Sequence, residues 1–250
     1  IKTLRELSGV PKFYQFFTAR TISNFGNGIS PVALAFGVLG IDGANGGSLS
    51  LVQGARTLPI LLLLIVGGTI ADKYGRAKVM GLTDMWLSVL ILIAAWSFIA
   101  GNPSVWLLVI VGLLAGLLNG IWYPAFAGLM PILVPEEKLQ SANAATGFGS
   151  NVAFMLGTAS GGVVVAVWGV GWALAVDAVT FLIAGALVYP LSKLHQKGQV
   201  EAGEKVNFIK ELTLGWHEFR TRSWLVTIVV AFAVLNMSFE AVWAVLGALQ

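Results

Sequence analysis

The stretch Gly68-Thr-Ile-Ala-Asp72-Lys73-Tyr74-Gly75-Arg76-Ala-Lys78 stands between two long apolar runs and decides the fold. It places an acid at the end of the first run, a glycine where the chain must reverse, and two basic residues at the start of the second run. Basic side chains in a short connection between apolar runs are typical of a membrane loop on the cytoplasmic side. The stretch therefore predicts a tight cytoplasmic turn between two membrane helices.

The composition indicates the same class of protein. Of the 250 residues, 57% are hydrophobic and 11% are charged, and the mean hydropathy is +0.83. Charged residues make up roughly a quarter of an ordinary soluble domain, so that class is excluded and an all-α membrane protein is predicted. The chain has no cysteine, which excludes disulfides, thiol chemistry and cysteine-based metal sites.

Apolar segments long enough to cross a bilayer recur along the chain. They lie at about 13–39, 49–71, 79–100, 105–130, 143–168, 171–190 and 224–250. Lys and Arg gather before the first segment and in every second connection, while the other connections have none. The positive-inside rule therefore predicts a cytoplasmic N-terminus.

Segment 191–223 differs from the short connections because it is rich in Lys, Glu, Gln and Gly. We expect a cytoplasmic linker there. Apolar residues at helical spacing within it predict an amphipathic helix, lying either on the inner leaflet or packed under the bundle. The chain begins at Ile and stops in an apolar run, and we expect it to be a fragment.

The turn resembles the signature G-x-x-x-D-(R/K)-x-G-R-x-(R/K) between helices 2 and 3 of the major facilitator superfamily of transporters. Residues 25–34 and 131–143 are similar to the branch that contains bacterial siderophore exporters and macrolide efflux proteins. The resemblance implies a major facilitator fold in the bacterial inner (plasma) membrane. Residues 1–190 would form the six-helix N-terminal bundle, and 224–250 the first helix of a truncated C-terminal bundle.

For the turn, the resemblance implies a conformational latch, in which the acid meets a helix N-terminus of the missing C-terminal half. The alternative is plain topology, with Asp72 paired locally to Lys73 or Arg76. The positions that match the signature are Gly68, Asp72, Lys73, Gly75, Arg76 and Lys78.

Charged residues inside spans are functional candidates, because an unpaired charge at membrane depth is costly. Arg56 and Asp177 lie at matching depth, so an ion pair is one possibility. The resemblance separates their helices, however, which favours a cavity role for Arg56 and a structural role for Asp177. Asp84 lies near the cytoplasmic face, where we expect it to neutralise Arg76 or Lys78.

Glu240 accompanies Asn236 and Ser238 in the seventh span, the helix that lines the central cavity in the superfamily. A carboxylate in an apolar cavity gains the ability to exchange protons near neutral pH, as proton-coupled antiport requires. The alternative is a solvated acid near the external end.

Polar residues of the first span fall on one face, with Ser23, Asn27 and Ser30 at helical spacing and Asn24 adjacent. This stripe would either line a substrate path or join helices by hydrogen bonds. The predicted cavity residues are Asn24, Asn27, Ser30, Gln53, Arg56, Asn119 and Glu240.

Small residues at four-residue spacing predict close helix packing in the fourth and fifth spans. They are Gly112, Gly116, Gly120, Gly157, Gly161 and Gly162. The second group is similar to the family's antiporter motif, which ends G-P-x-x-G-G, but Thr158 replaces its proline. The kink that this proline normally provides is therefore in doubt.

The sequence has no P-loop, and His195 and His217 lack the spacing of a metal pair. We expect no cofactor, no metal, no nucleic-acid partner and no enzymatic activity. The leading interpretation is a secondary transporter that exports a small amphiphilic molecule by alternating access, coupled to protons. The alternatives are a transport-inactive sensor or assembly subunit on the same fold, or an importer.

Overall fold

The computed structural model describes residue 7 and residues 9–197, 220–232, 234 and 235. The chain divides into two units, residues 1–198 and residues 199–250, and each is described by itself. Six long helices in the first unit are long and apolar enough to cross a membrane. They are α2 (Pro11–Leu39), α3 (Gly46–Tyr74), α4 (Arg76–Ile99), α5 (Val105–Leu133), α6 (Leu139–Trp168) and α7 (Val170–Val188), with the 3-10 segments η1 (Glu136–Lys138) and η2 (Tyr189–Lys197).

These helices match the six predicted spans closely and extend several of them. The shortest, α7, has 19 residues, which gives a length of about 28 Å and suffices for a hydrocarbon layer of about 30 Å. The seventh predicted span is described at Ser223–Phe232, an apolar helix, and at two residues beyond it. The rest of that span, and residues 198–219 of the predicted linker, lie outside the described residues.

Glycine and asparagine set the helix ends. Gly75 ends α3 and begins α4 with φ 92°, a conformation that side chains with a Cβ rarely adopt. Gly169 joins α6 to α7 in the same way, with φ 85°. Asn45 caps α3, its side-chain Oδ1 accepting from the N–H groups of Gly47 (2.9 Å) and Ser48 (3.2 Å). The predicted tight reversal at Gly75 is therefore a single-residue junction.

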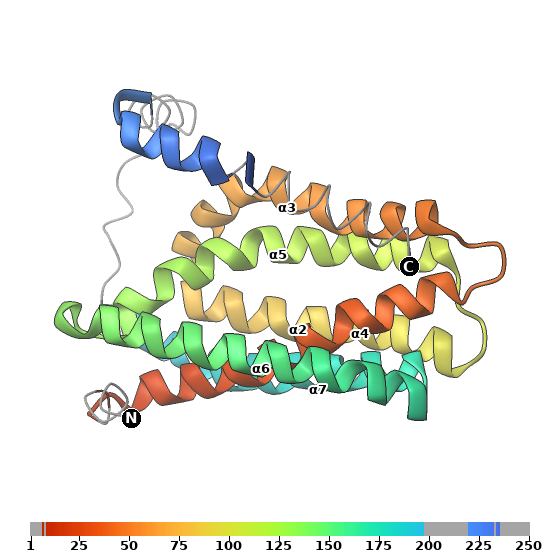
Figure 1. The fold of residues 1–250 in the computed structure, drawn as a ribbon. Coiled ribbons are helices and arrows are strands. Elements are labelled where there is room, and N and C mark those ends of the chain that lie inside the picture. Colours follow the sequence, from red (N-terminus) through yellow and green to blue (C-terminus); the bar gives the residue numbers. More distant parts are fainter. Residues whose placement is uncertain (1–6, 8, 198–219, 233, 236–250) are drawn as a thin grey trace. The chain divides into compact units, whose positions relative to one another are not determined.

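The six helices run antiparallel to their chain neighbours in an elongated bundle (Figure 1). Within it α3 packs on α5, α2 packs on α6 and α7, and α4 packs on α7 and α5. The start of α2, the α3–α4 junction and the α5–α6 connection lie at one end, and the connections 40–45 and 100–104 lie at the other (Figure 1).

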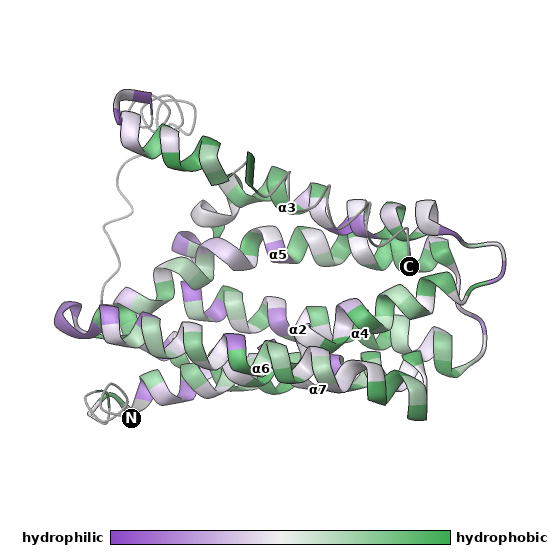
Figure 2. Cartoon of the chain, in the orientation of Figure 1, coloured by the Kyte–Doolittle hydropathy of each residue, from purple (hydrophilic) through white to green (hydrophobic). Residues whose placement is uncertain are grey.

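Two large apolar clusters and a smaller one, made of Leu87, Ala115 and Phe181, form the core of the described bundle. The first centres on Phe13, Phe16, Met80 and Leu129, and the second includes Ile29, Val38, Val52, Leu108 and Leu174. The outward faces of the helices are also apolar (Figure 2). Because large exposed apolar surfaces are unfavourable in water, this outer surface fits a hydrocarbon environment. The smaller cluster contributes Phe181 to the wall of the candidate site.

Candidate functional site

A cavity of about 620 Å³ opens between α2, α5 and α6 and reaches single residues of α3 and α7. Its size falls within the range of small-molecule pockets. Its wall combines amides, hydroxyls, aromatic rings and two guanidinium groups. The lining residues are Arg20, Asn24, Asn27, Pro31, Arg56, Asn119, Trp122, Tyr123, Phe126, Met130, Asn143, Thr146, Gly147, Ser150, Asn151, Phe154 and Phe181.

The predicted polar stripe of α2 divides between this cavity and other surroundings. Asn24 and Asn27 line the cavity, and the Asn24 Nδ2 donates to the Arg20 carbonyl (2.8 Å) and to the Ser150 Oγ on α6 (3.2 Å). Ser30 lines a smaller neighbouring pocket, and Ser23 is fully buried outside both. Asn24 and Asn27 thus face the cavity, and Asn24 also links α2 to α6 by a hydrogen bond. That the stripe lines a substrate path stays a prediction.

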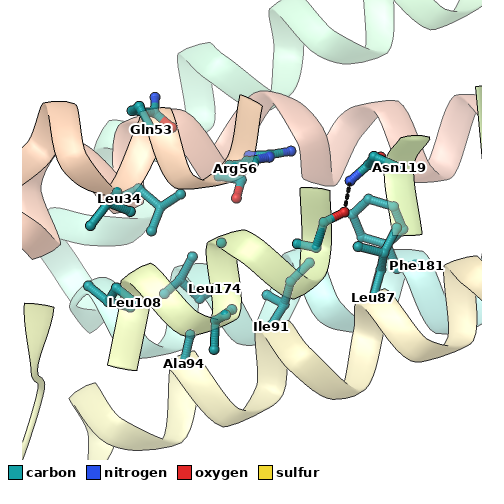
Figure 3. Close-up of a pocket in the computed structure, with 15 residues that line it drawn as sticks. Leu34, Gln53, Arg56, Leu87, Ile91, Ala94, Leu108, Asn119, Leu174 and Phe181 are labelled. Atoms are coloured by element: carbon teal, nitrogen blue, oxygen red, sulfur yellow. Dashed lines mark hydrogen bonds between the residues drawn. The ribbon is translucent and has the colours of Figure 1, made fainter. Parts of the chain in front are cut away.

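The smaller pocket, of about 50 Å³, adjoins the cavity through three shared residues, Arg56, Asn119 and Phe181. Figure 3 shows the Arg56 guanidinium extending toward the Asn119 amide, with apolar side chains of α4, α5 and α7 below them. Asn119 Nδ2 donates to the Ala115 carbonyl at 2.8 Å. Gln53 lines this pocket only. The structure therefore brings Arg56 and Asn119 together at the junction of the two spaces.

Arg20 is the main lining residue that the sequence analysis missed. Its side chain is buried, with its Cζ 4.3 Å from the centroid of the Trp122 ring and 5.4 Å from that of Phe126. These are cation–π distances. The sequence contained a signal for this residue, because an arginine inside an apolar span is a functional candidate by default.

A second missed group lies on α6. Asn143, Thr146, Ser150 and Phe154 recur at intervals of three and four residues, which places them on one helical face toward the cavity. Helical spacing of polar residues in the fifth span was the signal that could have found them.

The expected partner of Asp84 is wrong. Asp84 makes no ion pair with Arg76 or Lys78 and instead lies fully buried, in electrostatic interaction with Arg20 and beside the Trp122 indole. The reason is geometric, because the carboxylate lies about 12 Å along α4 from Arg76 and faces α2 and α5 instead of the turn. Neither of its oxygens has a hydrogen-bond partner among the described residues.

Asp177 is buried against α2. A Cβ on Gly26 would overlap its Oδ1 and the Thr180 hydroxyl, so the glycine makes room for this carboxylate. The Asp177 carboxylate lies beside the Ser30 hydroxyl and interacts electrostatically with Arg56. Within the described part of the chain it forms no direct ion pair with Arg56. This position, between packed helices, suits the structural role expected for it.

At the turn, Asp72 pairs with Arg76 one helical turn away. The Asp72 Oδ1 accepts from the Arg76 Nε at 2.8 Å and lies 2.8 Å from Nη2. The Arg76 guanidinium lies over Gly128 of α5, where a Cβ would overlap it. Asp72 is 61% exposed, which leaves one carboxylate edge open at the end of the bundle.

The other signature residues of the turn are less constrained. Lys73 lies with its Nζ 5.3 Å from the Tyr74 ring centroid, and Lys78 is exposed. At Gly68 the nearest atom to an added Cβ is the Pro124 Cβ, at 3.9 Å. The close approach to α5 occurs at its neighbour Gly67, where a Cβ would overlap the Gly120 carbonyl.

The glycine ridges lie at two helix contacts. On α5, Gly112, Gly116 and Gly120 face α3, and a Cβ on Gly116 would overlap the Arg56 carbonyl. On α6, Gly157 and Gly161 face α2, and a Cβ on Gly157 would overlap the Phe25 carbonyl.

Gly162, unlike Gly157 and Gly161, does not lie at the contact between α6 and α2. A Cβ there meets nothing within 4 Å in the described structure, because one residue further along a helix turns the side chain to another face. Thr158, in the place of the motif's proline, donates its hydroxyl to the Gly28 carbonyl of α2 (3.2 Å) and to Phe154 of its own helix (3.0 Å). It thereby links α6 to α2 where the proline would bend the helix.

Glu240 and His217 lie outside the described residues, and the side chain of His195 is likewise not described. Among the residues that the structure describes, no three of His, Cys, Asp and Glu gather as metal ligands would.

Comparison with known proteins adds the family. A model of the family described as "Transmembrane secretion effector" matches residues 9–249. The staphyloferrin A transporter of Staphylococcus aureus is 28% identical over 179 residues, 70% of this chain and 44% of the relative. The macrolide efflux protein A of Streptococcus pyogenes is 24% identical over 211 residues, 82% of this chain and 50% of the relative.

A third relative, the multidrug efflux pump Tap of Mycobacterium tuberculosis, is 28% identical over 171 residues, 66% of this chain and 40% of the relative. The chain thus spans about half the length of the curated relatives that it matches. These relatives are membrane transporters of bacteria, not enzymes. The chain belongs to the transmembrane secretion effector family, within the efflux branch of the major facilitator superfamily.

Proposed function

We propose that the protein is a secondary exporter of a small amphiphilic molecule, driven by the proton gradient and working by alternating access. The observation that carries the proposal is the 620 Å³ cavity between α2, α5 and α6, with polar amides and aromatic rings in one wall. Such a mixed wall suits a ligand with an apolar body and a few polar groups. The names of two relatives, a macrolide efflux protein and a multidrug efflux pump, support the direction of transport.

A second six-helix half completes the transporter in this proposal, since the relatives are about twice as long as the matched region.

The N-terminus lies in the cytoplasm. The supporting observation is charge, because Lys12, Lys73, Arg76, Lys78 and Lys138 lie at one end of the bundle, while connections 40–45 and 100–104 contain no Lys or Arg (Figure 1).

Asp72 acts as a cytoplasmic latch to the second half, using the carboxylate edge that its pairing with Arg76 leaves exposed. A helix N-terminus of that half is the natural partner, because its dipole attracts a carboxylate.

Glu240 carries the transported proton. An importer or a transport-inactive sensor on the same fold is an outcome that the experiments below distinguish.

Cysteine accessibility tests alternating access, since residues 1–250 contain no native cysteine. In the full-length protein, Ser150→Cys in the cavity wall is expected to react with a membrane-impermeant maleimide from both faces. Asp72→Asn should raise labelling from the cytoplasmic face about two- to five-fold, as loss of a helix-dipole contact implies. Ser88→Cys, which is buried away from the cavity, should stay unlabelled.

Ser104→Cys serves as the orientation control, because Ser104 is exposed at the start of α5. It should react from the external face only. Labelling of Ser150→Cys from a single face would contradict alternating access, and an unchanged ratio in Asp72→Asn would remove the latch.

A further inference from the structure

The charged residues in the cavity wall are all of one sign. Arg20 and Arg56 line the cavity, and no Asp, Glu or Lys is among the described residues that line it. The remaining polar groups of the wall are amides, hydroxyls and a phenol, which are neutral. On the described wall, a ligand therefore meets two guanidinium groups and no carboxylate.

The two buried acids nearby do not face the ligand space. Asp84 is 0% exposed and Asp177 is 1% exposed, and neither lines the cavity. Asp84 interacts electrostatically with Arg20, and Asp177 with Arg56, but neither acid forms an ion pair within 4.0 Å. Among the described residues, the one such ion pair joins Asp72 and Arg76. The acids offset part of the positive charge, and in the described structure their oxygens accept no hydrogen bond from either arginine.

Arg20 has buried donors aimed at no protein acceptor. Its Nε and Nη1 atoms are buried and have no hydrogen-bond partner in the described structure, while the side chain, 5% exposed, lines the cavity. Binding through these two donors requires the guanidinium group to turn toward the ligand. Buried donors without partners are costly, and a guanidinium presents its N–H groups in a fork that matches the two oxygens of a carboxylate. The Trp122 and Phe126 rings both lie at cation–π distance from the guanidinium group.

We propose that the cavity selects an organic anion, a molecule with a carboxylate that Arg20 and Arg56 bind and a flat apolar part that the aromatic wall accepts. This anion selectivity rests on the proposed transport function and adds the charge of the transported substrate. Trp122, Tyr123 and Phe126 supply the apolar contact. A cationic ligand of the same shape is disfavoured, because no carboxylate of the described wall compensates its charge.

Two dyes with the same xanthene core test the assignment by binding alone. Carboxyfluorescein is anionic, and tetramethylrhodamine methyl ester is cationic. In purified full-length protein in phosphatidylcholine nanodiscs, fluorescence polarisation should show saturable binding of carboxyfluorescein at least about ten-fold tighter than of the cation. Arg56→Gln should weaken carboxyfluorescein binding about ten- to a hundred-fold, as loss of a charge-assisted hydrogen bond implies.

The neutral double variant R20Q/D84N tests the second arginine while keeping the buried charges balanced, and it should weaken binding by a similar factor. Arg20→Lys should lose less, because it keeps the charge. Lys12→Gln, an exposed cation outside the cavity, is the matched control and should bind as wild type.

Tighter binding of the cation, no binding of either dye, or wild-type affinity in both Arg56→Gln and R20Q/D84N would overturn the assignment. Transport is scored separately in vesicles. Anion binding without transport of any compound would overturn the proposed function alone, and proton-driven transport with a preference for the cation would overturn the anion assignment alone.

Discussion

Replacing Gly157 by alanine is expected to destabilise the protein, whereas the same change at Gly162, five residues further along α6, is expected to be neutral or stabilising. A Cβ at Gly157 would overlap the Phe25 carbonyl, and the Gly28 Cα lies 3.2 Å from the same point. The backbones of α2 and α6 must then separate, which costs about 1–3 kcal/mol of the free energy of unfolding.

Gly162 offers the matched control because an added Cβ meets nothing within 4 Å. Alanine there gains up to about 1 kcal/mol, since glycine is a poor helix former. The thermal unfolding midpoints of the two purified variants measure the contrast. Equal midpoints would show that the α2–α6 contact does not depend on the small residue at Gly157.

The second large effect is expected at the buried charges. Arg20→Gln leaves the Asp84 carboxylate buried without its neighbouring cation, beside the Trp122 indole. Removing one partner of a direct buried ion pair costs about 3–5 kcal/mol of the free energy of unfolding. Arg20 and Asp84 interact without forming an ion pair within 4.0 Å, so the loss should lie at or below the lower end of that range. The double variant R20Q/D84N should recover most of that loss, because it removes both charges.

The exposed pair Asp72 and Arg76 provides the comparison. A double-mutant cycle compares the two single variants with the double variant. For Asp72 and Arg76 it should give a coupling free energy below about 1 kcal/mol, since Asp72 is 61% exposed and water screens the pair. Denaturant titration of the purified variants measures both cycles. Additive losses in the Arg20 and Asp84 cycle would show that the two charges do not stabilise each other.

The spans could be predicted from the sequence because apolar runs of bilayer length and the placement of Lys and Arg do not depend on tertiary contacts. The turn at 68–78 was also predictable, since Gly75 adopts a positive φ that few other residues tolerate.

The faces of the helices could not be predicted in the same way. In a soluble helix the apolar stripe marks the buried side, but these helices are apolar around much of their surface (Figure 2). The rotation of each helix was therefore uncertain. This is why Asp84 was assigned to Arg76 or Lys78 instead of Arg20, and why Gly162 was grouped with Gly157.

Close contacts between helices depend on partners far away in the sequence. Gly67 and Gly128 carry tight approaches that no local pattern marks, because their partners are the Gly120 backbone and the Arg76 side chain. Arg20 is different, since a charge inside an apolar span was a visible signal that the sequence analysis passed over.

Uptake into everted membrane vesicles tests the central claim, proton-driven export, most directly. The full-length protein would be presented with carboxyfluorescein, a macrolide, a siderophore and a lipophilic cation, with and without a protonophore. The account predicts accumulation of at least one compound, collapsing when the protonophore is added and absent in Glu240→Gln. Accumulation that ignores the protonophore, or no accumulation of any compound, would contradict it.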